Sequence, residues 1–167
     1  MSKSIPTPND QEVKELIALY KAKDFNKLKN KADAILEKNK EHHIALNILG
    51  LSFTAQGDIE KALRSFDESI KIKPDYAVAY NNKANIFLKK KEYDEAIILF
   101  KKAYNFDPTT KIKFNLANCY FKKEEFDEAI QIYEEIIDAD EKLLEAHKNL
   151  GLSYQAKEKY DEAQVDF

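Results

Sequence analysis

Small and aromatic residues return along this chain at a spacing of 33 or 34 residues, and this periodicity constrains the fold more than any other feature. In the stretch 76–108 the residues concerned are Ala84, Phe87, Ala96 and Phe100. Their counterparts in the other copies are Gly50, Phe53, Ala62 and Phe66, then Ala117, Tyr120, Ala129 and Tyr133, then Gly151, Tyr154, Ala163 and Phe167. A period of roughly 20 to 50 residues is typical of proteins that stack similar units. We therefore expect a repeat architecture.

Each copy has the pattern of two amphipathic helices joined by a short turn. The first helix of the stretch 76–108 carries Tyr80, Ala84 and Phe87 on one face, because residues three, four and seven apart lie together on a helix. The second helix carries apolar residues at the same spacings, namely Tyr93, Ala96, Ile97, Phe100 and Ala103. A single pair cannot bury its apolar face alone, so neighbouring copies must cover it. The sequence therefore predicts an all-α protein.

The copies resemble the tetratricopeptide repeat (TPR). The residues that carry the resemblance are Leu49, Gly50, Phe53, Gly57, Ala62, Phe66 and Pro74, with matching positions in the later copies. The resemblance covers about residues 10–167 and implies a right-handed α-solenoid of antiparallel helix pairs. Gly50 and Ala62 are small where two helices should cross closely. Gly57 can adopt the left-handed conformation that ends the first helix.

We expect a flexible leader at 1–9, where Pro6 and Pro8 disfavour a helix, followed by the solenoid at 10–167. The expected repeats cover about 10–42, 43–76, 77–109, 110–143 and, in part, 144–167. The chain ends part-way along an amphipathic helix, without the polar capping helix that solenoids usually need. It is therefore expected to be a fragment, with self-association through the uncapped C-terminal edge as a consequence.

The first repeat departs most from the pattern. Its first helix is expected to bury a stripe made of Val13, Leu16, Ile17 and Tyr20. Tyr20 lies five residues before Phe25, whereas Phe53 lies six residues before Ile59. This spacing predicts a tighter turn in the first hairpin.

Asparagines provide the candidate binding site. In the TPR family the first helices of successive repeats line a concave groove, and the resemblance places five asparagines there: Asn82, Asn85, Asn115, Asn118 and Asn149. A carboxamide both donates and accepts, so a column of them could hold an extended peptide backbone. Lys89 and Lys122, at the ends of first helices, would give this groove a weakly basic rim that favours an acidic partner. The alternatives are that the asparagines are ordinary groove residues and that the lysines form a solvated face.

Several function classes find no support in the sequence. The net charge is −3, and no apolar run approaches the length of a membrane span, so we expect neither a nucleic-acid nor a membrane partner. His42 and His43 are adjacent, while His147 is distant and expected at a packing position, so neither a metal site nor a cofactor is predicted. Cys119, the only cysteine, is expected to be a small buried filler rather than a nucleophile.

The function expected from the sequence is a non-catalytic, cytoplasmic scaffold that binds a protein or peptide segment in its groove. Some relatives clamp the terminal carboxylates of chaperones with lysine and arginine residues. The corresponding cations are missing here, and Glu145 would repel a carboxylate, so this variant is disfavoured. Two alternatives remain open. The chain could be the substrate-recruiting arm of a larger enzyme, such as a glycosyltransferase or sulfotransferase, or a homo-oligomeric self-assembly module.

Overall fold

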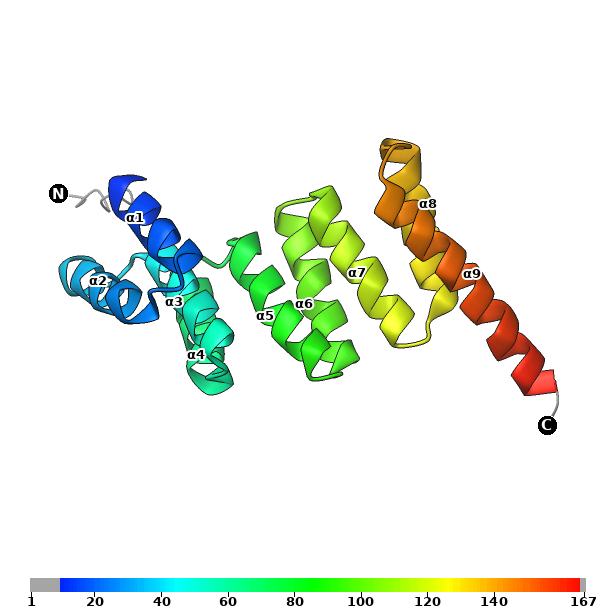
Figure 1. The fold of residues 1–167 in the computed structure, drawn as a ribbon, viewed down its shortest axis with the longest axis horizontal. Coiled ribbons are helices and arrows are strands. Elements are labelled where there is room, and N and C mark those ends of the chain that lie inside the picture. The colour runs from blue at the N-terminus through cyan, green and yellow to red at the C-terminus, as the bar shows by residue number, and fades with distance from the viewer. Residues whose placement is uncertain (1–9, 166–167) are drawn as a thin grey trace. The chain divides into compact units, whose positions relative to one another are not determined.

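The computed structural model describes residues 10–165, with side chains from residue 11 to residue 158, and this part of the chain is all helix and turn (Figure 1). The expected leader at 1–9 and Phe167 lie outside the described residues. The helices are α1 (Asp10–Lys21), α2 (Phe25–Lys38), α3 (His43–Gln56), α4 (Ile59–Ile72), α5 (Ala77–Lys89), α6 (Tyr93–Phe106), α7 (Thr110–Lys122), α8 (Phe126–Ala139) and α9 (Leu144–Val165). Helices α3, α5, α7 and α9 begin at steps of 34, 33 and 34 residues, as the periodicity predicted. The expected all-α solenoid of helix pairs is confirmed.

The chain divides into two compact units, with the boundary inside α5 between Lys83 and Ala84. The first unit contains α1 to α4 and the start of α5. Its buried cluster includes Leu16 of α1 together with Leu28 and Ala32 of α2. Ile17 was expected in this core, but 40% of its surface is exposed. Because it directly follows Leu16, it points about 100° away from the buried stripe on the helix.

The four hairpin turns share one geometry. Each passes through a residue with positive φ: Lys23 (56°), Gly57 (81°), Lys91 (63°) and Glu124 (68°). The next residue then donates its amide N–H to the carbonyl five residues earlier, in the pairs Asp24 to Leu19, Asp58 to Phe53, Glu92 to Phe87 and Glu125 to Tyr120, at 2.9–3.1 Å. Leu19, not Tyr20, is therefore the counterpart of Phe53. The tighter first turn was a wrong prediction that arose from aligning the repeat on the wrong residue.

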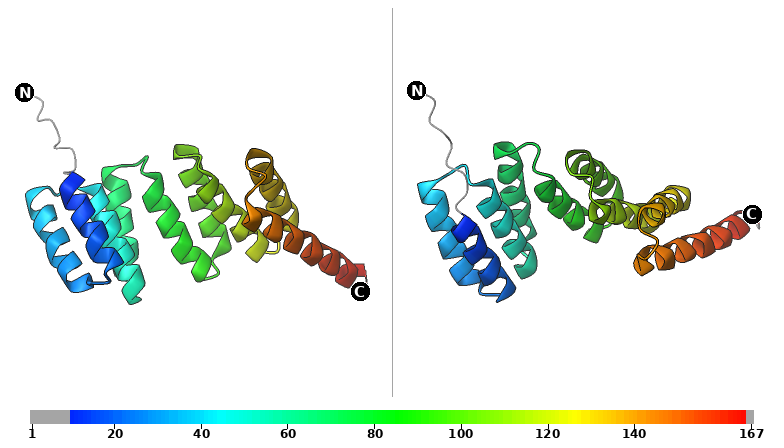
Figure 2. Two further views of the ribbon diagram at one scale, coloured as in Figure 1. Left: turned by 45° about the horizontal axis from the view of Figure 1, so that its top comes forward. Right: turned by 90° about the horizontal axis from the view of Figure 1, so that it is seen from above.

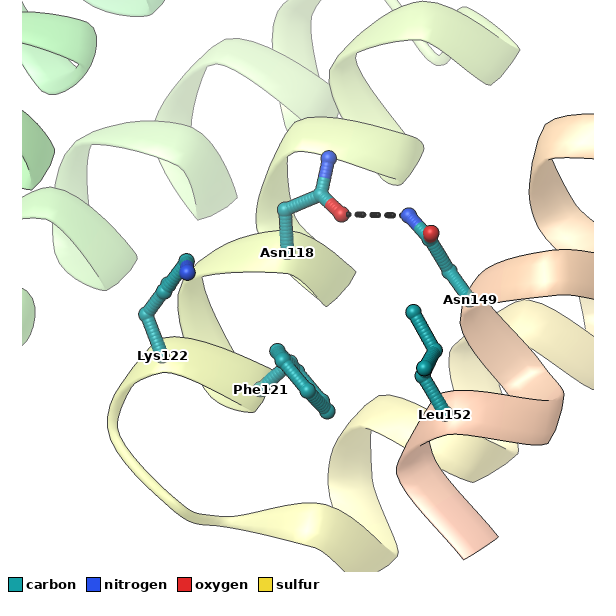
Figure 3. A pocket seen from close by; sticks show the side chains of 5 residues that line it. All are labelled: Asn118, Phe121, Lys122, Asn149 and Leu152. Atoms are coloured by element: carbon teal, nitrogen blue, oxygen red, sulfur yellow. Dashed lines mark hydrogen bonds between the residues drawn. The ribbon is translucent and has the colours of Figure 1, made fainter. Parts of the chain in front are cut away.

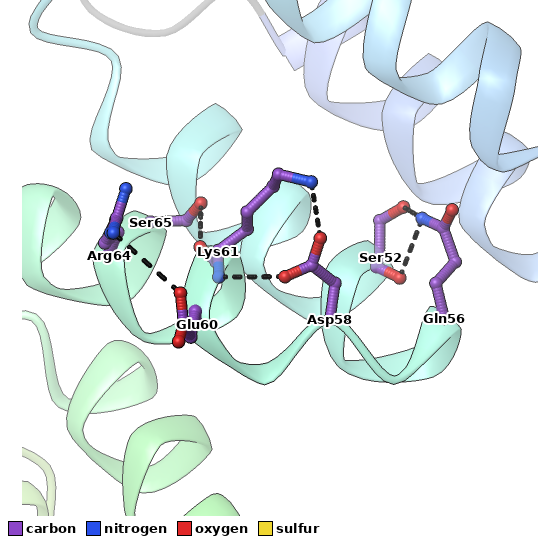
Figure 4. A network of polar contacts seen from close by, with 7 residues as sticks. All are labelled: Ser52, Gln56, Asp58, Glu60, Lys61, Arg64 and Ser65. Atoms are coloured by element: carbon purple, nitrogen blue, oxygen red, sulfur yellow. Dashed lines mark hydrogen bonds and ion pairs between the residues drawn. The ribbon is translucent and has the colours of Figure 1, made fainter.

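The α3–α4 hairpin shows why its small residues are needed. The Phe66 side chain is fully buried beside Gly50. A Cβ added to Gly50 would lie 2.6 Å from Cε1 of Phe66, closer than real side-chain carbons approach. After the turn, Asp58 caps α4 by accepting a hydrogen bond from the Lys61 amide at 3.2 Å (Figure 4). Close packing and a polar cap thus act on the same hairpin.

The second unit runs from Ala84 through α9. Its core repeats the small and aromatic pattern in fully buried form, with Ala84, Phe100, Ala117, Ala129 and Tyr133 all at 0% exposure. The hairpins of this unit lack the side-chain cap seen at Asp58. Glu92 and Glu125 occupy the cap positions of α6 and α8, and neither makes a capping hydrogen bond.

The fifth repeat differs from the others after its first helix. In the sequence, Tyr160 and Ala163 match positions that begin a second helix elsewhere, yet α9 continues unbroken through both (Figure 2). The side chains of both residues lie outside the described part. Helix α9 lies against α8, and Tyr154 donates a hydrogen bond to Glu134 at 2.6 Å. None of the described helices is long and apolar enough to cross a membrane.

Candidate partner-binding site

Two pairs of asparagines connect successive first helices. In the first unit, Asn82 of α5 donates to Oδ1 of Asn47 of α3 at 3.0 Å. In the second unit, Asn149 of α9 donates to Oδ1 of Asn118 of α7 at 2.9 Å. Three predicted site residues are therefore already engaged in bonds between repeats. These bonds fix the orientation of the carboxamides, which limits the entropy lost if they contact a partner.

A buried tyrosine orients the second pair. Tyr133 of α8 is fully buried, and its hydroxyl donates to Oδ1 of Asn118 at 2.6 Å. Burial raises the pKa of this phenol to about 12, so it stays a neutral donor. Oδ1 of Asn118 thus accepts two hydrogen bonds, one from Tyr133 and one from Asn149. Within the described residues, Nδ2 of Asn118 and Oδ1 of Asn149 remain without protein partners.

These two asparagines line a pocket between α7 and α9. Its volume is about 180 Å³, and Figure 3 shows its lining of Asn118, Phe121, Lys122, Asn149 and Leu152. Phe121 and Leu152 supply apolar surface, and Leu152 is 43% exposed. The pocket therefore combines fixed amide groups, an apolar wall and one cation. Three of the predicted site residues, Asn118, Lys122 and Asn149, come together here.

The lysines at the ends of first helices have different surroundings. Lys123 pairs with Asp94 at 2.7 Å and with Glu125 at 2.5 Å, and these hydrogen bonds raise its pKa. Lys122 makes no ion pair with any described residue, and its Nζ lies 6.0 Å from the centre of the Phe121 ring. Lys89 is exposed at the end of α5. Lys122 is therefore a cation whose charge is available at the pocket.

The other predicted residues do not join this pocket. Asn85 lies on α5 and Asn115 on α7, and both are half-buried. Asn82 belongs to the first unit with Asn47. Sequence reasoning missed the roles of Phe121 and Leu152. Leu152 lies one repeat period after Asn118 and occupies the equivalent position. The change from asparagine to leucine at this position was the sequence signal that could have identified Leu152 as a pocket residue.

Chemically reactive side chains lie elsewhere. Cys119 is fully buried, as expected, and burial raises the pKa of its thiol to about 11. His147 was expected at a packing position, but it is exposed, and its Nε2 lies 2.9 Å from the carbonyl oxygen of Glu141. His42 is buried and caps α3, with Nδ1 accepting from the Ala45 amide at 3.1 Å. Among the described residues, no cluster of three His, Cys, Asp or Glu side chains could hold a metal ion.

Comparison with known sequences agrees with this architecture. A tetratricopeptide-repeat family model matches residues 41–109, and a model of anaphase-promoting complex, cyclosome, subunit 3 matches residues 89–165. The chain is 33% identical over 66 residues to the tetratricopeptide repeat domain-containing protein PYG7, chloroplastic, of Arabidopsis thaliana. That match covers 40% of this chain and 22% of PYG7. The chain thus spans less than a quarter of this relative.

Solved structures share the fold at low sequence identity. MamA (residue 41 to its end) from Desulfovibrio magneticus RS-1 has a TM-score of 0.78 and 18% identity, covering 97% of this chain and 92% of that chain. A chain in the structure of Naa15/Naa10 bound to HypK-THB has a TM-score of 0.76 and 21% identity, covering 95% and 24%. YrrB, described as a TPR protein with an unusual peptide-binding site, has a TM-score of 0.72 and 16% identity, covering 88% and 76%. Repeat spacing, helix pairs and these likenesses agree that the chain is built from tetratricopeptide repeats.

Proposed function

We propose that this chain is a non-catalytic scaffold that binds a segment of a partner protein along the face formed by its first helices. One observation carries the proposal: α7 and α9 bring Asn118, Lys122 and Asn149 together around a pocket of about 180 Å³. This volume is smaller than the roughly 300–1,000 Å³ typical of small-molecule sites, and it suits a single side chain of a longer ligand. Asn82, Asn85, Asn115 and Lys89 would extend the contact along other first helices.

Two structural neighbours support a protein or peptide as the ligand. The Naa15/Naa10 assembly is bound to HypK-THB, and YrrB is described with a peptide-binding site. Both share this fold at low identity, so they support the kind of partner but identify no residue contacts. An extended segment suits amides in fixed orientations, because a peptide group presents one donor and one acceptor.

Asparagine substitution tests the proposal. The protein is used to select binders from a displayed library of short random peptides, and the selected peptides are measured by fluorescence anisotropy. Asn149→Ala removes one pocket amide while keeping the bond between Tyr133 and Asn118. We expect it to weaken binding severalfold, since one net hydrogen bond contributes about 0.5–1.5 kcal/mol.

Asn26→Ala is the matched control, because Asn26 is exposed on α2, a second helix. It should leave peptide binding unchanged. Circular dichroism should show the same helicity for both variants. Equal peptide affinity for wild type and a combined Asn82, Asn115 and Asn149 alanine variant would remove the first-helix face from consideration.

Self-assembly is the second candidate function, and one observation favours it. Helix α9 exposes large apolar side chains, with Leu144 at 80% and Tyr154 at 49% exposure. If copies associate through this edge, Leu144→Glu should lower the association constant in equilibrium sedimentation. A wild-type protein that stays monomeric at high concentration would exclude it.

Location is part of the same proposal. A cytoplasmic scaffold fits a chain with one buried thiol, although the name of the relative PYG7 includes the word chloroplastic. Imaging of the tagged natural protein tests this point. The alternative is an arm that recruits substrate for a larger enzyme, and sequencing the natural gene tests it.

A further inference from the structure

The polar groups of the α7–α9 pocket are arranged for a peptide unit. Oδ1 of Asn118 is occupied by the Tyr133 hydroxyl and by Asn149, which leaves Nδ2 of Asn118 as a donor. Asn149 donates through its own Nδ2, which leaves its Oδ1 as an acceptor. A donor and an acceptor on neighbouring carboxamides match the C=O and N–H of one residue in an extended segment, because both groups of that residue point to the same side of the chain.

The apolar part of the pocket is suited to an aliphatic side chain. Phe121 and Leu152 lie on the opposite side of the pocket from the two carboxamides (Figure 3). Leu152 is 43% exposed, so covering it would remove further apolar surface from water. An exposed leucine beside a half-buried phenylalanine and a small hollow gives a branched aliphatic group both contact surface and space.

The charge of the pocket bears on a second side chain on the same face of an extended ligand. Its lining has one cation, Lys122, and no carboxylate. Asp94 and Glu125 are both paired with the adjacent Lys123, and Glu124 does not line the pocket. Lys122 has no ion-pair partner among the described residues, so its charge favours an acidic ligand.

We infer that the α7–α9 pocket selects a partner segment in extended conformation that carries an aliphatic residue and, two positions away, an acidic one, because alternate side chains of an extended segment point the same way. The aliphatic side chain contacts Phe121 and Leu152, the N–H and C=O of one ligand residue bond the two asparagines, and the carboxylate lies near Lys122. This inference rests on the proposed function and adds a sequence preference to it.

The test is a selection of short random displayed peptides on wild-type protein and on pocket variants. Lys122→Glu should replace the acidic residue of the selected motif by a basic one, because the charge at the rim is reversed. For a wild-type peptide, it should weaken binding in anisotropy by at least about threefold to fivefold, as expected for loss of an exposed ion pair. Leu152→Ser should abolish the aliphatic preference while Lys122 keeps the acidic one.

Lys111→Glu is the matched control, since Lys111 is an exposed lysine on α7 that does not line the pocket. It should leave the motif unchanged. If Asn149→Ala weakens binding but Lys122→Glu selects the same motif as wild type, the inference is overturned and the proposed function stands. If wild-type protein enriches no peptides above a bare support, both are overturned.

Discussion

Gly50 and Gly151 hold the same position in their repeats, yet their surroundings differ completely. Gly50 is buried on α3 against the Phe66 ring of α4, with no room for even a methyl group. Gly151 is exposed on α9, and an added Cβ would find no described atom within 4 Å. The sequence around both reads Leu-Gly-Leu-Ser. At Gly50, glycine is therefore required by the close approach of α4.

The two regions also end their first helices differently. Helix α3 stops at Gln56 and turns through Gly57, whereas α9 passes the corresponding position, Glu158, without a break. A left-handed residue other than glycine is unfavourable by about 1–2 kcal/mol. In the hairpins that turn through Lys23, Lys91 and Glu124, burial between the two helices offsets this cost. Tertiary packing, rather than the local sequence alone, thus decides where a first helix ends.

The largest expected effect comes from removing the side chain that distinguishes Gly50. Phe66→Ala should destabilise the protein by about 3–5 kcal/mol, because Phe66 is fully buried. Chemical denaturation followed by circular dichroism measures this change. Phe106→Ala is the control: Phe106 is 48% exposed, and its truncation should have a much smaller effect. Equal losses for the two variants would contradict the assigned packing.

The two glycines should respond in opposite directions to the same substitution. Gly50→Ala should destabilise by about 1–3 kcal/mol, because its Cβ would lie 2.6 Å from the Phe66 ring. Gly151→Ala should stabilise by about 0.5–1 kcal/mol, because alanine loses less backbone entropy in an exposed helix. Thermal or urea unfolding of the two single variants gives the comparison directly. Adding Phe66→Leu to Gly50→Ala should make the two changes non-additive, since they share one contact.

Much of the fold was predictable because equivalent residues recur at a fixed spacing, so the repeats can be aligned with one another. Helix starts, the close approach at Gly50 and the left-handed turn at Gly57 all follow from residue types at a fixed period. The first turn was mispredicted because an aromatic residue, Tyr20, was aligned where Leu19 has that role. Local similarity in side-chain type was weaker evidence than the hydrogen-bond pattern of the turn.

The site was predictable only in part, for a similar reason. Asn118 and Asn149 were identified from their family positions, but their mutual hydrogen bond depends on the distance between α7 and α9. Tyr133 was assigned to the core, and its hydroxyl also orients Asn118. Leu152 breaks the amide column, so periodic reasoning passed over it. Contacts within one hairpin can be predicted from the sequence, because the same residue types recur in each repeat. Contacts between repeats can be identified only from the structure.

The turns offer a smaller test of how first helices end. Gly57→Ala should destabilise by about 1 kcal/mol, because alanine disfavours a φ of 81°. Lys91→Gly, in the α5–α6 turn, should stabilise by a similar or smaller amount, because Lys91 already adopts a φ of 63°. Urea midpoints of both variants are compared with wild type. If Lys91→Gly destabilises the protein, the Lys91 side chain stabilises the fold by more than its unfavourable backbone conformation costs.

The smallest expected effect depends on pH and concerns the caps of α3 and α4. Burial lowers the pKa of His42, so the folded state favours the neutral imidazole, whose Nδ1 accepts from the Ala45 amide. Its contribution to stability is therefore complete above the unfolded pKa of about 6.5 and is lost as the pH falls below that value through the folded pKa. Protonation would also place a positive charge at the positive end of the α3 dipole.

Asp58, the cap of α4, responds in a different pH window. Hydrogen bonds from Lys61 lower the pKa of its carboxyl group, so this cap persists to below about pH 4.

Replacing His42 by Asn keeps a capping oxygen and removes the titration. The measurement compares pH 7.5 with pH 5.5, which bracket a histidine pKa of about 6.5. Over this change, the free energy of unfolding of wild type should fall by a few tenths of a kcal/mol to about 1 kcal/mol more than that of His42→Asn. His43→Gln controls for the neighbouring imidazole, whose pKa is also lowered by burial. If the free energy of unfolding changes with pH in the same way for wild type and His42→Asn, the buried imidazole does not set the pH response. The caps of α3 and α4 would then differ in residue type but not in how pH affects them.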